Sequence, residues 1–232
     1  MKRNDQRSTT DRRGFLGTMA TGAAALTLGT IASPLQTLAK DRIGNEENDA
    51  DAWFNKVKGK HRIVFDVTKP NEMMPFAWSR IFLLTNQATG TKESDNGVVV
   101  VLRHSGIPYA MSNNMWSKYN FGDMFKVDDQ LTGKPATRNP FWQPKDGDFK
   151  VPGIGSVNIG INQLQDSGVM FCVCNMALTV YSAATAEKMN LKHEDVLNEW
   201  KANILPGIQI VPSGVWAVGR AQEHGCAYCF AG

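Results

Sequence analysis

The sequence predicts an α/β fold in which a mostly parallel sheet has helices on both faces. Short runs of β-branched and other apolar residues recur along the chain, and helix-length segments separate them. The connections are short over much of the chain, which favours parallel strands joined by crossover helices. One run, Val98–Leu102, is apolar throughout, as expected of a strand in a sheet that is covered on both sides.

Residues 1–39 have the features of an export signal and are not expected to belong to the folded domain. Within the segment TDRRGFL, twin arginines stand shortly before a Phe-Leu pair, and a mildly apolar stretch rich in Ala, Gly and Thr follows. This arrangement resembles a twin-arginine (Tat) signal. Thr37-Leu38-Ala39 offers a small-residue cleavage site, so we expect a mature chain that begins near Lys40. We therefore expect a periplasmic or otherwise exported protein without a stable membrane anchor after cleavage.

The expected mature chain has 193 residues, which fits a single domain, and it is electrically neutral. The signal carries five of the 25 basic residues and two of the 22 acidic residues, which leaves 20 of each. The formal charge of +3 therefore belongs to the signal and does not indicate nucleic-acid binding. An oxidising compartment would favour disulfides between unprotected thiols.

The first elements follow a polar lead-in over 40–58, in which we expect one short helix. His61–Val67 is a β-branched run and is predicted to be the first strand of the domain, which we place at 59–232. An amphipathic helix ending at Gly90 comes next. Its apolar face is marked by residues at i, i+4, i+7 and i+11, which are Ala77, Ile81, Leu84 and Ala88. The second strand is Val98–Leu102.

Over 105–150 the regular pattern weakens, and Gly, Pro, Asn, Trp and Met accumulate. A short helix is expected near 108–119, and the rest is interpreted as an insertion or a long ordered loop. The aromatic residues of this segment argue against disorder. They are Trp116, Tyr119, Phe121, Phe125, Phe141 and Trp142.

The last part of the chain again alternates between helices and strands. Ser213 is expected to cap a helix that Gly225 ends, because hydroxyl side chains favour helix starts and glycine favours helix ends. The other elements expected here are helices at 159–166, 175–188 and 194–202 and strands at 169–173, 208–211 and 226–230.

With these elements in place, the chain resembles the DsrE/DsrF-like family of small α/β domains. Three segments carry the resemblance: VVVLRHSG around His104, FCVCNMAL, and IQIVPSGVWAVGRAQEHGCAY at 208–228. It covers about 60–232, with the aromatic insertion the poorest match, and it implies a flavodoxin-like three-layer domain.

Known members of that family include sulfur-relay proteins that carry sulfur as a persulfide on one cysteine, often within homo- or hetero-oligomers. The resemblance therefore implies a homo-oligomer or a partner protein. Many members have no assigned activity, so the fold does not by itself give a function.

The resemblance places a reactive cysteine where a strand enters its helix, at Cys172 or Cys174. We favour Cys174, because free backbone N–H groups and the helix dipole would stabilise a thiolate at the helix start. As residues i and i+2 of one strand, the two cysteines are expected to face the same side. The alternative is that both are small, buried apolar residues.

His104 is expected at the same sheet edge as Cys174, where ligands of open α/β sheets bind. It would pair with a thiolate, carry a proton or ligate a metal, or else be a hydrogen-bonded structural histidine. Arg103 would balance an anionic ligand or simply be exposed. Trp116 and Trp142 of the insertion would roof a binding pocket.

The pair in C-A-Y-C, Cys226 and Cys229, follows a helix instead of opening one, so it lacks the field that activates a redox dithiol. Positions i and i+3 of a regular strand face opposite sides. Three interpretations stay open: core residues, a disulfide to Cys172 or Cys174 on a neighbouring strand, and, ranked last, a metal site that uses all four cysteines.

The leading hypothesis is an exported DsrE-like protein that handles sulfur or thiols through Cys174, with His104 and Cys172 assisting. Whether it is an enzyme stays open, and no cofactor is expected. One alternative is a non-catalytic module for small-molecule binding or assembly. A weaker alternative is a soft-metal protein, but Met111 and Met115 fit hydrophobic packing better than such a site.

Overall fold

The computed structural model describes residues 46–232, so the expected export signal and its cleavage site lie outside the described residues. The central sheet has five strands in the order β8-β7-β2-β1-β9, and every pairing in it is parallel. The predicted α/β architecture with a mostly parallel sheet is therefore confirmed. The strands are β1 (His61–Val67), β2 (Asn96–Leu102), β7 (Met170–Cys174), β8 (Ile208–Val211) and β9 (Ala227–Phe230).

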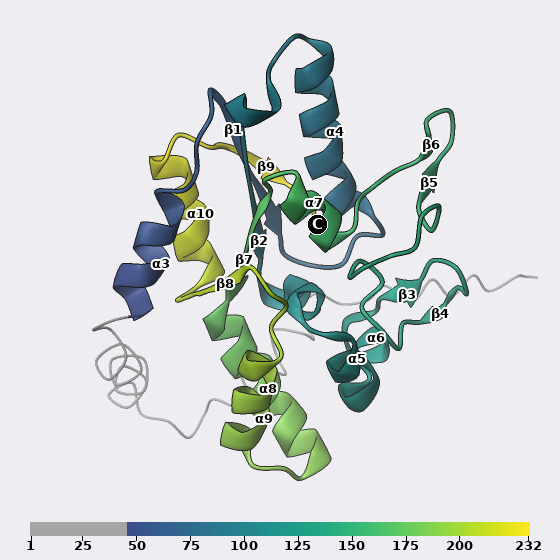
Figure 1. The fold of residues 1–232 in the computed structure, drawn as a ribbon. Helices are drawn as coiled ribbons and strands as arrows, with labels where there is room; N and C mark the ends of the chain where they lie inside the picture. Colours follow the sequence, from purple (N-terminus) through teal and green to yellow (C-terminus); the bar gives the residue numbers. More distant parts are fainter. Residues whose placement is uncertain (1–45) are drawn as a thin grey trace, which may run out of the picture. The chain divides into compact units, whose positions relative to one another are not determined.

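Helices cover both faces of this sheet and make three layers (Figure 1). Helices α3 (Glu46–Phe54) and α10 (Gly214–Glu223) lie on one face, and α4 (Met74–Ala88) and α7 (Ile161–Asp166) lie on the other. The residues of β2 alternate between the two resulting cores, because successive side chains of a strand point to opposite faces. The sheet is thus buried on both sides, as the apolar run in β2 predicts.

Helix α3 is part of the folded unit, not of a polar lead-in. Its residues Ala50, Trp53 and Phe54 are buried and pack in the same core as Val64 of β1 and the inner face of α10. The folded unit consequently begins near residue 47, before the expected boundary at 59.

Helix α4 buries a different face from the one that the sequence pattern indicates. Ile81 and Leu84 are 39% and 47% exposed, whereas Phe76 and Leu83 are buried. Phe76 sets the orientation, because its ring lies 4.2 Å from that of Phe141 between their centroids. The helix is apolar around most of its circumference, so periodicity alone does not distinguish two neighbouring stripes.

The segment between β2 and α7 is ordered and contributes much of the larger core. Asn139 is fully buried, and its side-chain amide donates to the carbonyl oxygens of Tyr109 and Met111 at 2.9 Å. Met111 and Met115 are buried in this core, as the packing interpretation predicts. The elements of the segment are η2 (His104–Ala110), α5 (Asn113–Tyr119), α6 (Phe121–Phe125), β3 (Asp128–Asp129), β4 (Lys134–Pro135), β5 (Lys150–Val151) and β6 (Gly155–Ser156).

Helices α8 (Asn175–Met189) and α9 (His193–Ala202) follow β7 and pack together close to their predicted positions. Ser213 caps α10 by accepting the Trp216 N–H at 3.2 Å, and Gly225 follows its end with φ +82°, both as predicted. A short η1 turn (Glu93–Asp95) precedes β2. Within 46–232, no helix is long and apolar enough to cross a membrane.

Candidate functional site at the carboxyl edge of the sheet

A buried carboxylate stands at the carboxyl end of β1. Asp66 is only 2% exposed, and it receives two hydrogen bonds from Arg103, Nε to Oδ1 at 2.6 Å and Nη2 to Oδ2 at 2.8 Å. The hydroxyl of Tyr228 on β9 donates to Oδ2 at 2.9 Å. This bidentate geometry fixes the guanidinium, because both of its donors meet one planar acceptor.

The position of Arg103 follows from the sheet and from a glycine. It comes directly after β2, next to β1, and its own N–H donates to the Val67 carbonyl at 3.0 Å. Its side chain lies against the first turn of α10, where a Cβ on Gly214 would stand 2.3 Å from the Arg103 Cβ. Only glycine therefore allows this close approach.

Cys174 ends β7 and is the N-cap residue of α8. It is 6% exposed, and its Sγ accepts a hydrogen bond from the Ala177 N–H at 3.3 Å. The hydrogen bond to Asp66 raises the pKa of Arg103, and negative charge on Asp66, Tyr228 and Cys174 adds to the shift. The thiol thus stands at a helix N-terminus and within the electrostatic range of a fixed cation.

Cys172 has a different environment from Cys174, contrary to the expectation that both face one side. Cys172 is fully buried in the core beneath α10, whereas Cys174 packs in the opposite core. The strand alternation breaks because Cys174 turns its thiol toward the α8 N–H groups. Burial raises the pKa of Cys172, and the negative charge of Cys174 adds to this, so Cys172 stays a neutral thiol.

His104 follows β2 as expected, but no contact among the described residues joins it to a cysteine. Its side chain is exposed, and its Nδ1 lies 3.4 Å from the hydroxyl of Tyr181 and 3.3 Å from that of Ser105. The backbone of His104 is left-handed, with φ +50°, and this turns the residue away from the strand direction. Arg103 interacts electrostatically with Cys174, whereas no such interaction with His104 is found among the described residues.

The C-terminal cysteines cannot bond to the upstream pair, which corrects the disulfide interpretation. Strand β9 is separated from β7 by β2 and β1, so about 14 Å of sheet lies between them. The same separation excludes a metal site shared by all four cysteines. Cys226 is buried in the α10-side core and Cys229 packs against the other, so they face opposite sides as predicted. All four are free thiols.

The two tryptophans expected to roof a pocket both pack against the larger core. Trp116 is fully buried, and its indole N–H donates to the Pro108 carbonyl at 3.1 Å. Trp142 is partly buried and packs on the larger core. Within 46–232, no group of three or more His, Cys, Asp or Glu residues is arranged to hold a metal ion.

Sequence reasoning missed Asp66 and Tyr228 as members of this site. The signal for Asp66 is in the sequence, because an acid inside the apolar run HRIVFDV needs a partner if the strand is buried. Tyr228 stands in the C-A-Y-C segment between two cysteines, and its role depends on β9 pairing with β1. That pairing is not visible in the order of the residues.

Comparison with known proteins adds little at this level of similarity. No family model matches the sequence, and no curated protein matches it. Among solved structures, the chain is similar to a protein of unknown function from Methanobacterium thermoautotrophicum. That match has 19% identity and a TM-score of 0.32, and it covers 73% of this chain and 98% of the other.

Proposed function

We propose that this protein is an exported DsrE-like protein that handles sulfur or thiols through Cys174, with Arg103 as the positioning cation. The observation that carries the proposal is the Cys174 thiol at the start of α8, where it accepts the Ala177 N–H at 3.3 Å. Arg103, which Asp66 fixes, interacts electrostatically with the same residue and supplies a positive charge on this side of the sheet.

The chemistry that suits this arrangement is the transfer of one sulfur atom. The Cys174 thiolate attacks the terminal sulfur of a donor persulfide, a new S–S bond forms on Cys174, and the donor leaves as a thiolate. No external oxidant is needed, because the electron pair of the broken S–S bond goes to the leaving sulfur. The backbone N–H of Ala177 at the start of α8 can donate a hydrogen bond to the Cys174 sulfur before and after transfer.

The test is thiol mapping on the folded, reduced protein. Cys229 is partly exposed and would react without any activation, so the experiment uses a Cys229→Ser background. We expect iodoacetamide at neutral pH to label Cys174 and to leave Cys172 unlabelled, as read by peptide mass spectrometry. Burial raises the pKa of Cys226 to about 11, so its labelling should increase only as the pH approaches that value.

A glutathione persulfide donor should then add one sulfur atom to the Cys174 peptide. Cys174→Ser is the matched variant, because its hydroxyl still accepts the Ala177 N–H while the nucleophile is lost. Arg103→Gln should slow the labelling of Cys174 by several-fold. If Cys174 reacts only after unfolding, or if persulfide sulfur accumulates equally on Cys226, the proposed function is wrong.

A further inference from the structure

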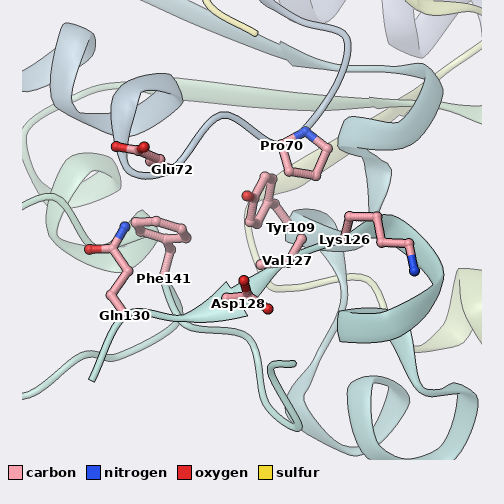
Figure 2. Close-up of a pocket in the computed structure, with 8 residues that line it drawn as sticks. All are labelled: Pro70, Glu72, Tyr109, Lys126, Val127, Asp128, Gln130 and Phe141. Atoms are coloured by element: carbon pink, nitrogen blue, oxygen red, sulfur yellow. The ribbon is translucent and has the colours of Figure 1, made fainter. Parts of the chain in front are cut away.

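A cavity lies between the loop after β1 and the segment that follows β2 (Figure 2). Its volume is about 170 Å³, and a cavity of roughly 150 Å³ accommodates one benzene ring. The buried part of its lining is apolar and aromatic: Tyr109, Val127 and Phe141. The exposed part carries polar side chains, which are Glu72, Lys126, Asp128 and Gln130.

No hydrogen bond joins the Tyr109 hydroxyl to another described residue, and the residue is only 1% exposed. Burial raises its pKa, so the hydroxyl is neutral at physiological pH. Its ring is held edge-on by Phe76 at 5.1 Å and by Phe141 at 5.4 Å between centroids, so it cannot turn away. In Figure 2 the hydroxyl points toward the side on which Phe141 and Glu72 lie. Because Tyr109 lines the cavity, a ligand bound there can supply a hydrogen-bond partner to this hydroxyl.

The charges around the cavity favour a cation. Two carboxylates, Glu72 and Asp128, stand against one ammonium, Lys126, so the lining has a net negative charge. Figure 2 shows the Lys126 ammonium extending away from the other labelled side chains. The aromatic walls add to this preference, because ring faces attract ammonium groups.

We propose that this cavity binds a small organic cation, a single apolar ring that bears an ammonium group. The ring packs against Phe141 and Val127. The ammonium donates one hydrogen bond to the Tyr109 hydroxyl oxygen and faces the carboxylates of Glu72 and Asp128. Cys174 does not line the cavity, so the proposal is independent of the proposed function.

The test compares three probes of nearly equal shape: benzylammonium, benzyl alcohol and benzoate. We expect benzylammonium to bind about tenfold more tightly than benzyl alcohol, and benzoate to bind most weakly, as followed by ¹H–¹⁵N NMR titration. The shifted amide signals should map to the segments around Tyr109 and Asp128. Equal affinity for benzoate, shifts that map elsewhere, or no binding of benzylammonium at millimolar concentration would overturn the proposal.

Three variants assign the binding to this cavity. Tyr109→Phe removes only the hydroxyl and should weaken benzylammonium binding about tenfold without loss of fold. Asp128→Asn should weaken it several-fold and reduce the preference over benzyl alcohol. Glu187→Gln makes the same charge change on the exposed surface of α8 and should leave the affinity unchanged. Unaltered binding in Tyr109→Phe, or an equal loss in Glu187→Gln, contradicts the assignment. Cys174→Ser should bind the probe normally, which separates this result from the thiol chemistry.

Discussion

At the scale of single residues, the carboxyl edge depends on one buried acid. Asp66 is almost inaccessible to water, and its two oxygens accept three hydrogen bonds from Arg103 and Tyr228. A buried carboxylate is tolerated only with such compensation, and removal of one partner leaves the charge without it. Asp66 also fixes the guanidinium of Arg103, which has a role in the proposed chemistry. Arg103 therefore contributes both to stability and to the proposed function.

Arg103→Leu should therefore destabilise the protein by about 2–3 kcal/mol, because Asp66 keeps only the Tyr228 hydrogen bond. The value lies below the usual cost of breaking a fully buried pair, since the Arg103 side chain is 28% exposed and water can partly replace it. Urea unfolding monitored by circular dichroism measures the loss. Arg138→Leu is the control, because its contact with Asp129 is 3.7 Å long and the Arg138 side chain is 40% exposed, so a change below about 0.5 kcal/mol is expected. Equal losses in the two variants would contradict this interpretation.

The sequence allowed part of this site to be predicted. The strand-to-helix junction at Cys174 was recognisable, because an apolar strand meets a helical pattern there. His104 was placed correctly at the end of its strand, but its left-handed backbone and its contact with Tyr181 depend on tertiary packing. The orientation of a side chain at a strand end is not fixed by strand periodicity, and this also explains why Cys172 and Cys174 face different cores.

At the scale of elements, strand and helix positions were predictable but their order in the sheet was not. All five strands of the central sheet were found from apolar runs, with ends within a few residues. The disulfide interpretation failed because it required β9 beside β7, whereas β9 pairs with β1. Local patterns give the length and burial of a strand, but partner choice depends on contacts that are distant in the sequence.

Helix ends provide a direct test at this scale. Lys126 ends α6 in the left-handed region, with φ +59°, and a side chain is disfavoured there. Lys126→Gly should stabilise the protein by about 0.5–1 kcal/mol in thermal or urea unfolding. Lys188→Gly in the last turn of α8 should instead destabilise it by about 0.5–1 kcal/mol, because glycine weakens a helix interior. The same sign for both substitutions would show that the backbone angle of Lys126 is not under strain.

At the scale of the whole folded unit, one edge of the central sheet, strand β9, carries exposed apolar side chains. Tyr228 and Phe230 of the edge strand β9 are 48% and 56% exposed, and an unpaired edge with apolar side chains favours association. The expected homo-oligomer or partner protein stays a prediction, and β9 is the edge to examine for it.

Residues 105–150 were predicted to be ordered from their aromatic content, but their burial in the larger core could be seen only in the structure.

A charged cluster connects residues 105–150 to helix α9, and we expect it to make the fold sensitive to acid. The Glu199 carboxylate on α9 accepts hydrogen bonds from the Lys118 ammonium at 2.6 and 2.8 Å and from the Tyr119 hydroxyl. The hydrogen bond from Lys118 lowers the pKa of Glu199, and the one from Tyr119 adds to the shift. Because the folded pKa lies below the ordinary value of 4.5, this contribution to stability is present above that pH. It is lost as the pH falls through the lowered folded pKa.

Glu199→Gln should accordingly cost about 0.5–1 kcal/mol at pH 7, the range of a partly exposed ion pair, and much less at pH 3. Gln keeps an oxygen that accepts from Tyr119 but loses the attraction to Lys118, so the charge accounts for the difference. Urea unfolding of both proteins at pH 7, 5 and 3 measures it, with Glu187→Gln as the exposed control that should show no such trend. A cost that stays constant across this range would mean that Glu199 acts through packing. In that case the insertion would be held to α9 by the aromatic contact of Tyr119 with Trp200, at 5.6 Å between centroids, and not by charge.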